Sequence, residues 1–283
     1  MLDSELRQRL IDFISIQPRS IEEVARHINK NWRTANRYIE RLVDEGILSV
    51  KVFRAGTRGA LKIVYLNTPY QMFNLFQRDL YEKIMNGRRK EDFSPFEIWQ
   101  YIEDDKKEAF LEEQEDESAT AFNKDLFRIM RHAKREIYIF SGNLSWARLM
   151  DRDTSIIDLL RHLSDRVRVY IVARIDMTAI DNAKRMLTIN HDKKKEVIKI
   201  RHRAQPLRAL VIDDSLLRLK EVYDPSKYKK GELNRKTYIF YDIRDTEWIK
   251  WIKKVFWDMY YKSIDADIRI REMEKIHRLN RTI

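Results

Sequence analysis

The stretch SIEEVARHINKNWRTANRYIERLVDEG, which begins at Ser20, constrains the fold more than any other part of the chain. Ser20 and Glu23 form the S-x-x-E pattern of a capping box, in which each side chain bonds the backbone amide of the other residue, so a helix is predicted to begin there. After the polar turn NKN, Ile39 and Leu42 stand at helical spacing, and Gly46 occupies the place of a left-handed helix end. The sequence therefore predicts two short helices joined by a tight turn.

The segments on either side of this pair extend the pattern. Leu6, Leu10 and Phe13 are spaced as on one face of a helix, which is predicted to end before Pro18. The segment ILSVKVFRAGTRGALKIVYLN alternates apolar and polar residues around the glycine-containing turn RAGTRG, which predicts a β-hairpin. Three helices followed by such a hairpin are typical of a winged helix-turn-helix, and we expect this DNA-binding fold over residues 1–68.

The predicted third helix and the hairpin carry long hydrogen-bond donors suited to phosphates and to base edges in a major groove. The candidate DNA-binding residues are Lys30, Arg33, Thr34, Asn36, Arg37, Arg41, Arg54, Arg58 and Lys62. We expect Arg33, Thr34, Asn36 and Arg37 to read bases, and Arg41, Arg54 and Arg58 to hold backbone phosphates. The alternative is a solvated basic face, which is the usual position of charges on a helix surface.

Composition limits the other function classes. The 56 Lys and Arg against 45 Asp and Glu give a formal charge of +11, which favours a polyanionic partner such as nucleic acid, although a membrane surface could also attract it. The chain has no cysteine, which excludes disulfides, thiolate zinc sites and cysteine nucleophiles, and its six glycines form no phosphate-loop motif. The acidic stretch 103–117 lacks EF-hand spacing and is expected to be a solvated surface. No signal peptide or spanning segment is recognised, so we expect a cytoplasmic protein that has no cofactor and no metal and does not bind membranes.

The rest of the chain divides into a connector, a larger domain and a tail. Residues 69–90 predict a connecting helix with apolar residues near heptad spacing, Leu80 and Ile84 among them. This helix either packs on its own chain or forms a dimer contact, and we favour the dimer because two half-sites commonly need two readers. Residues 91–262 alternate helical and strand periods with closely spaced strands, which indicates an α/β domain with a mixed sheet. Residues 263–283 predict a basic C-terminal helix.

The order of elements between Ile137 and Tyr261 resembles one half of the phospholipase D superfamily, whose motif is H-x-K-x-x-x-x-D before a strand hairpin. In that family the histidine is the nucleophile or general acid, the lysine binds phosphate, and the aspartate orients its partner. In the stretch HRAQPLRALVIDDS, aligning Asp213 with the motif aspartate places Pro206 at the histidine position and Arg208 at the lysine position. Proline has neither a nucleophilic nitrogen nor a transferable proton, and His202 lies four residues too early in a predicted loop. We therefore expect a non-catalytic domain.

The whole chain resembles the TrmB-type archaeal transcription regulators, in the helix-turn-helix, the connecting helix, the stretches FEIWQYIEDDKK and LFRIMRHAKREIYIFSGN, and the degenerate phospholipase D-like half. The expected fold class is multi-domain α/β, with an N-terminal winged helix-turn-helix followed by a phospholipase D-like α/β domain that has a mixed sheet. The resemblance implies that the first domain binds promoter DNA and that the second binds a small effector.

Loops at the carboxyl ends of parallel strands are the usual ligand location in open α/β sheets, which directs attention to the loop SGNLSW. The candidate effector-binding residues are Asn143, Trp146, Arg208 and Asp213. Two alternatives stay open, in which Trp146 belongs to the core and Arg208 forms a structural ion pair with Asp213.

The leading hypothesis is a homodimeric, sequence-specific transcription regulator that binds double-stranded DNA. One alternative is a chromatin protein that coats DNA without sequence preference, which the large positive charge permits. The other is a nuclease or phosphodiesterase of the phospholipase D type with a displaced site, against which Pro206 argues.

Overall fold

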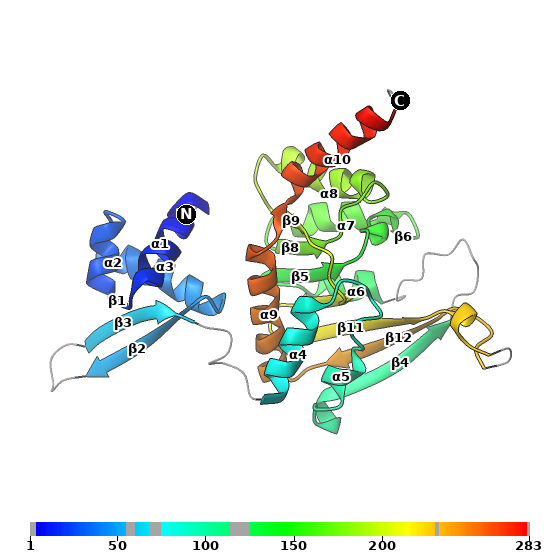
Figure 1. The fold of residues 1–283 in the computed structure, drawn as a ribbon, viewed down its shortest axis with the longest axis horizontal. Helices are drawn as coiled ribbons and strands as arrows, with labels where there is room; N and C mark the ends of the chain where they lie inside the picture. The colour runs from blue at the N-terminus through cyan, green and yellow to red at the C-terminus, as the bar shows by residue number, and fades with distance from the viewer. Residues whose placement is uncertain (1–3, 55–59, 68–74, 114–124, 230–231, 282–283) are drawn as a thin grey trace. The chain divides into compact units, whose positions relative to one another are not determined.

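The computed structural model describes residues 4–54, 60–67, 75–113, 125–229 and 232–281. The chain divides into two compact units, Met1–Arg78 and Asp79–Ile283 (Figure 1). Among the described residues, no helix has the length and apolar character needed to cross a membrane.

The first unit contains the helices and strands that the sequence predicts, in the predicted order. Its elements are α1 (Ser4–Ile16), β1 (Arg19–Ser20), α2 (Ile21–His27), α3 (Trp32–Asp44), β2 (Leu48–Arg54) and β3 (Ala60–Leu66). The strands form an antiparallel sheet in the order β1-β3-β2. The sequence did not predict β1, because two residues are too few to show an alternating pattern. The first unit is thus a winged helix-turn-helix.

Local sequence signals fix both ends of the helix pair. Ser20 Oγ accepts a hydrogen bond from the Glu23 amide, and the Glu23 carboxylate accepts one from the Ser20 amide, so the predicted capping box is confirmed. Gly46 has a φ of 74°, and its amide donates to the Val43 carbonyl at 2.8 Å, which closes the end of α3. Glycine adopts this left-handed conformation without the steric cost that a Cβ brings.

A single core holds the first unit together. Leu10 of α1, Ile21 of α2, Ile39 of α3 and Val64 of β3 are completely buried and belong to one cluster. Burial of each such side chain stabilises the fold by roughly 1.5–3 kcal/mol. The apolar stripes predicted on the three helices therefore face one another, and the opposite face of α3 is left to solvent.

The second unit begins within the predicted connecting helix, which is α4 (Leu75–Asn86). Leu80 and Ile84 are buried within their own chain, and the Tyr81 hydroxyl donates to Asp258. Two of the residues at heptad spacing are therefore covered without a second copy, whereas Phe76 is 57% exposed.

The other elements of the second unit alternate between helices and strands. They are α5 (Phe96–Trp99), η2 (Asp104–Lys106), β4 (Lys107–Glu113), α6 (Leu126–Arg131), β5 (Glu136–Ser141), η3 (Ser145–Arg148), β6 (Met150–Asp151), β7 (Thr154–Ser155), α7 (Ile156–Leu163), β8 (Arg168–Ala173), α8 (Ile180–Lys193), β9 (Ile198–His202), β10 (Ala209–Ile212), β11 (Leu216–Tyr223), η4 (Pro225–Lys227), β12 (Thr237–Ile243), α9 (Thr246–Tyr261), β13 (Ile264–Asp265) and α10 (Ala266–Arg281). The last of these is the predicted C-terminal helix.

The main sheet has the order β13-β9-β8-β5-β10-β11-β12-β4. Strands β5, β8 and β9 are parallel, and the other pairings are antiparallel, so the predicted mixed sheet is confirmed. The edge strand β4 occupies part of the acidic stretch that was expected to be only a solvated surface. Charged side chains on an edge strand discourage pairing with other chains. Such an acidic strand has the composition of a solvated surface, so the sequence did not indicate a strand here.

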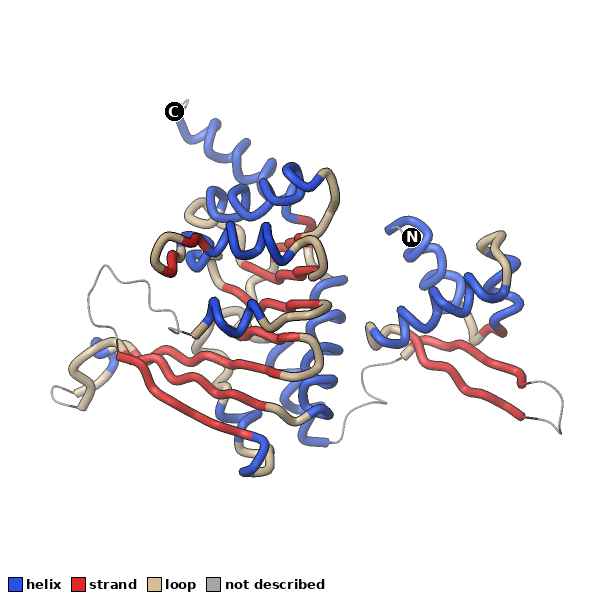
Figure 2. Tube along the Cα trace, turned by 180° about the vertical axis from the view of Figure 1, so that it is seen from behind, coloured by secondary structure: helices blue, strands red, loops and turns tan. Residues whose placement is uncertain are grey.

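Helices cover both faces of the parallel part of the sheet (Figures 1 and 2). On one face, residues of α6, α7, α8 and α10 form a single apolar cluster with Ile139 of β5 and Ile171 of β8. On the other face, the rings of α9 pack against Tyr138 and Tyr170; the Tyr170 and Trp257 ring centroids are 4.8 Å apart. The antiparallel part, from β10 to β12, carries the residues that form the cavity described below.

Candidate nucleic-acid interface and ligand cavity

Helix α3 presents one apolar and one basic face. At its beginning, Asn31 Oδ1 accepts a hydrogen bond from the Thr34 amide at 2.8 Å, which caps the helix. Ile39 on the inner face is completely buried, while Arg33 and Arg37 on the outer face are exposed. Among the described residues, neither arginine forms an ion pair, and the Arg37 guanidinium lies 5.7 Å from the Tyr38 ring centroid. Their donors are thus available to an external acceptor.

A polar cluster joins α3 to the wing strand β3. Lys62 Nζ donates to Asn36 Oδ1 at 3.1 Å, and Asn36 Nδ2 donates to Glu40 at 2.6 Å. The Lys62 ammonium also lies 5.3 Å from the Trp32 ring centroid, within the range of a cation–π contact. Two sequence-predicted residues, Asn36 and Lys62, are therefore in direct contact, and the cluster fixes the wing strand against α3.

The remaining predicted residues of the first unit differ in their surroundings. Arg41 Nε donates to Glu45 at 3.2 Å, and Arg7 donates to the same carboxylate at 2.7 Å, which links the end of α3 to α1. Lys30 is exposed in the turn before α3. Arg54 ends β2, but its side chain and the whole of Arg58 lie outside the described residues.

The second unit contains a cavity of about 650 Å³ on the sheet face that packs against α6. Its floor is made by alternating residues of β11 and β12 and by the beginning of β10, and its walls come from α6, from the loop after β5, and from the chain after α4. The carboxyl ends of the parallel strands β5 and β8 contribute Asn143 and Arg174. This is the ligand position expected for an open α/β sheet.

The structure brings together three of the four predicted effector-binding residues. Asn143, Trp146 and Arg208 all line the cavity. Trp146 is also part of the apolar core, and its indole nitrogen donates to Ser141 Oγ at 3.0 Å, so the alternative reading of this residue as a core residue is supported as well. Arg208 contacts Gly142 closely; a Cβ built at Gly142 would lie 2.8 Å from an Arg208 guanidinium nitrogen.

Asp213 does not belong to this group. It follows β10 at the end opposite Arg208, and its carboxylate accepts hydrogen bonds from the amides of Lys134, Arg135 and Glu136, each at 2.9 Å. The alternative of an ion pair between Arg208 and Asp213 is therefore wrong, because the length of β10 separates the two side chains. Asp213 closes the turn that begins β5.

The positions of the phospholipase D motif offer no histidine to the cavity. Pro206 is buried, lines a smaller cavity of about 220 Å³, and packs where a Cβ at Gly87 would meet it at 2.8 Å. His202 ends strand β9 rather than lying in a loop, and its Nδ1 accepts a hydrogen bond from the Ile175 amide at 2.8 Å. Burial lowers the pKa of His202, with Arg269 contributing in the same direction. No histidine lines the cavity in the described part of the chain, and the described residues form no metal-binding cluster.

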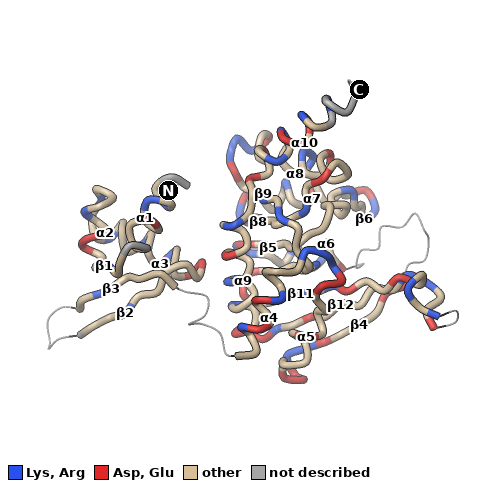
Figure 3. The backbone as a smooth tube through the Cα atoms, in the orientation of Figure 1, with Lys and Arg blue, Asp and Glu red and all other residues tan. Residues whose placement is uncertain are grey.

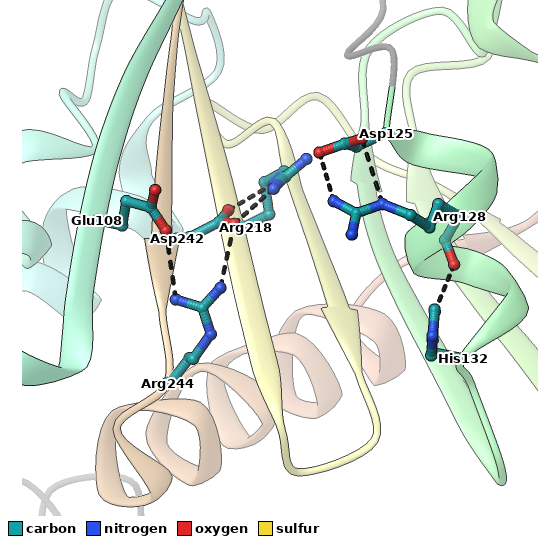
Figure 4. Close-up of polar contacts among 7 residues, drawn as sticks. All are labelled: Glu108, Asp125, Arg128, His132, Arg218, Asp242 and Arg244. Atoms are coloured by element: carbon teal, nitrogen blue, oxygen red, sulfur yellow. Dashed lines mark hydrogen bonds and ion pairs between the residues drawn. The ribbon is translucent and has the colours of Figure 1, made fainter.

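Arg218, which lines the cavity, forms a buried ion pair with Asp242 (Figure 4). The two residues face each other across β11 and β12, and Arg218 donates through Nε and Nη2 to the two carboxylate oxygens. Arg244 lies 4.0 Å from the same carboxylate and 3.7 Å from Glu108 of β4. The Arg218 charge is therefore neutralised inside the protein, and the ion pair joins β11 to β12.

Sequence reasoning missed Lys220 and Lys236, which also line the cavity. Lys220 stands opposite Arg208 across the β10–β11 pair; its amide donates to the Arg208 carbonyl at 2.8 Å. The signal for Lys220 was the alternation in LLRLKEV, which places Arg218 and Lys220 on the same face of a strand. Lysine and arginine, drawn in blue in Figure 3, are not confined to the first unit.

Comparison with known proteins shows similarity of fold at low sequence identity. Neither a protein-family model nor a curated protein matches the sequence. Among solved structures, the chain is similar to TrmBL2, an archaeal chromatin protein with a novel mode of DNA binding, at 14% identity over 92% of both chains and a TM-score of 0.38. It is also similar to Nuc, a phospholipase D family member from Salmonella typhimurium, at 13% identity over 56% of this chain and 97% of that one, with a TM-score of 0.39. NucT from Helicobacter pylori shows 14% identity over 56% and 99%, with a TM-score of 0.36.

Proposed function

We propose that this protein is a sequence-specific transcription regulator that binds double-stranded DNA as a homodimer and acts in the cytoplasm. The observation that carries the proposal is the outer face of α3, where Arg33 and Arg37 are exposed without an ion pair in the described residues. A guanidinium that is not engaged within the protein can bond a guanine edge in the major groove through two donors. The capped, core-anchored helix keeps these donors in place.

The polar cluster of Asn36, Glu40 and Lys62 supports base reading as well as phosphate binding. Because Asn36 already contacts both neighbours, its orientation is fixed before DNA arrives, and a fixed amide discriminates between bases better than a mobile one. Glu40 is exposed on the same face and can accept a hydrogen bond from a cytosine amino group. In this proposal Thr34 also reads bases, while Lys30, Arg41, Arg54, Arg58 and Lys62 hold phosphates.

A homodimer follows from the geometry of DNA rather than from α4. One recognition helix covers only a few base pairs, and two copies related by a two-fold axis read an inverted repeat. Leu80 and Ile84 are covered by their own chain, so the dimer contact that we propose uses other residues. The second unit would sense an effector through the cavity at Asn143, Trp146 and Arg208 and would not act as an enzyme.

The proposal is tested by selecting fragments of source-genome DNA that the full-length protein retains at about 150 mM salt, where the nonspecific charge interaction is weakened. We expect a recurring inverted repeat. Binding to that site should persist against about a thousandfold excess of random duplex. Uniform enrichment without a motif would overturn sequence-specific regulation in favour of a DNA-coating protein.

Variants of single arginines test the mapping onto α3. Arg37→Ala should weaken binding to the selected site about tenfold or more while changing binding to random DNA much less, since a bidentate base contact contributes roughly 1–3 kcal/mol of discrimination. Arg185→Ala is the matched control, because it removes the same charge from an exposed position on α8. Equal losses on both duplexes for Arg37→Ala would show that α3 does not read bases.

A further inference from the structure

Helix α3 begins with a tryptophan that the core of the first unit does not include. Trp32 is the first residue of the helix, its side chain is 42% exposed, and it lies outside the core cluster. Ala35 and Ile39, further along the same helix, are completely buried. A large ring left in water forgoes the stabilisation that burial gives, and it becomes informative when another exposed apolar side chain belongs to the same surface.

Val52 of strand β2 is this second side chain. The hairpin register pairs Val52 with Lys62 of β3, so their side chains lie on one face of the hairpin. This face is turned toward α3, because the Lys62 ammonium lies 5.3 Å from the Trp32 ring centroid and 3.1 Å from Asn36 Oδ1. Lys62 is thus a neighbour of both Trp32 and Val52, and Val52 is also 42% exposed. We call Trp32 and Val52 the apolar patch of the first unit.

The position of the indole ring is set from two sides. The Asn31 side chain caps the first turn of α3 by accepting a hydrogen bond from the Thr34 amide at 2.8 Å, which fixes the backbone around Trp32. The Lys62 ammonium approaches the ring as a cation–π partner, and its bond to Asn36 holds the lysine in turn. A side chain that is ordered before a partner arrives loses less entropy on binding.

The charges next to the apolar patch select the kind of partner. Arg33 directly follows Trp32, Arg37 lies about one turn further along α3, and both are exposed. An apolar protein surface that covered the patch would also have to cover these guanidinium groups, and burial of unpaired charges is costly. A DNA duplex offers phosphates and polar base edges to the arginines together with an apolar group for the ring. Charge complementarity therefore favours duplex DNA as the occupant.

Thymine is the base that presents an apolar group in the major groove, its C5-methyl, and apolar side chains read it by contact. The first residues of a recognition helix are the ones that reach base edges, and Trp32 occupies the first position. We propose that Trp32 contacts the C5-methyl of a thymine in each half-site, that Val52 extends the apolar surface, and that the two are specificity-determining residues. This inference rests on the proposed function, because it requires α3 to enter the major groove.

The contact has an energetic signature that differs from that of the arginines. Removal of one methyl group from an apolar contact weakens binding about fourfold. Salt screens the interactions of charged side chains with phosphates and leaves an apolar contact nearly unchanged. The preference for a methyl group should therefore keep its size when salt is raised, whereas the total affinity for DNA falls.

The experiment is fluorescence anisotropy of the full-length protein with the selected duplex and with a series of duplexes in which each thymine in turn is replaced by deoxyuridine, which lacks only the C5-methyl. At one thymine of each half-site, the replacement should raise the Kd about fourfold. Trp32→Gln should bind the thymine and uracil duplexes equally, whereas Trp32→Phe, which keeps a ring, should retain a preference for thymine.

Phe53→Ser is the matched control. Phe53 is the next residue of the same strand, is 52% exposed, and pairs with Leu61, so its side chain lies on the opposite face of the hairpin from Val52. We expect Phe53→Ser to keep the thymine preference of the unaltered protein. Val52→Ser should reduce this preference without abolishing it.

The inference is overturned if no single deoxyuridine weakens binding, a result that needs only the unaltered protein, or if Trp32→Gln keeps the full preference for thymine. A change of self-association in Trp32→Gln with an unchanged preference would assign the apolar patch to a contact between copies and also overturn it. A selected site without a methyl preference leaves the proposed function standing. If no site is selected, alternating A·T and A·U duplexes serve as probes; a preference for A·T that depends on Trp32 then keeps this inference, while sequence-specific regulation is lost.

Discussion

The buried ion pair of Arg218 and Asp242 gives the sharpest prediction about stability. Their side chains are only 8% and 4% exposed, and both oxygens of the carboxylate are bonded. Asp242→Asn keeps the shape of the side chain but leaves the Arg218 charge buried without its counter-ion. Removal of one partner of a buried pair costs about 3–5 kcal/mol. We expect about 3 kcal/mol here, since the asparagine carbonyl still accepts one hydrogen bond from the guanidinium.

This loss translates into a shift of the melting temperature. For a unit of roughly 200 residues, 1 kcal/mol corresponds to about 2–4 °C, so Asp242→Asn should lower the Tm of the second unit by about 6–12 °C. The double variant Arg218→Met with Asp242→Leu should lie within a few degrees of the unaltered protein, because apolar residues can replace a buried pair without loss. The double variant also loses the cation–π contacts of Arg218 with Phe110 and Phe240, at 4.9 and 5.8 Å. We therefore expect its Tm not to exceed that of the unaltered protein.

Tryptophan fluorescence measures this transition selectively, since five of the six tryptophans lie in the second unit. Asp104→Asn is the matched control; Asp104 is 96% exposed in its ion pair with Lys107, and we expect little change in Tm. A decrease of less than 2 °C for Asp242→Asn, with unchanged circular dichroism, would refute the reasoning. So would a double variant as unstable as Asp242→Asn.

Two further predictions concern a helix beginning and a buried lysine. Ser20→Ala removes the side-chain oxygen of the capping box and should lower the stability of the first unit by about 1 kcal/mol, visible as faster hydrogen exchange of the α2 amides; unchanged exchange would contradict it. The folded pKa of Lys220, about 8, lies below its unfolded value of about 10.4, so the unfolded state binds more protons between these values and stability rises with pH there. The unaltered protein should therefore gain about 2 kcal/mol in unfolding free energy from pH 7 to pH 9.5 relative to Lys220→Met, as measured by urea denaturation. A parallel pH dependence of the two proteins would show that Lys220 is well solvated.

The first unit was predictable because its signals are local. The capping box at Ser20 and the glycine at position 46 act within one turn of helix, and the apolar spacing of α3 repeats often enough to identify its inner face. The strand β1 escaped prediction because it exists only through pairing with Val64 and Ile63 of β3. The identity of two residues does not indicate which distant strand they pair with.

The residues that line the cavity were only partly predictable, because the pairing register of the strands decides which side chains lie side by side there. Asn143 was expected from the carboxyl end of a parallel strand and Arg208 from its alignment with the lysine of the phospholipase D motif, and both line the cavity. Lys220 and Lys236 come from an antiparallel hairpin, and only the pairing of β10, β11 and β12 brings them beside Arg208. Asp213 was grouped with Arg208 because both stand at positions of the phospholipase D motif, whereas an extended strand carries them to opposite ends of β10.

The two ends of the short strand β10 have different roles. At one end, the Asp213 carboxylate accepts hydrogen bonds from three backbone amides of the turn before β5, whereas the other end lines the cavity. The carboxylate at this position satisfies three backbone amides, whatever the residues at the other end of the strand bind. Arg208 and its neighbours at the cavity take no part in these hydrogen bonds. A substitution at the Arg208 end of β10 can therefore change what the cavity binds while the hydrogen bonds of Asp213, and with them the turn before β5, remain intact.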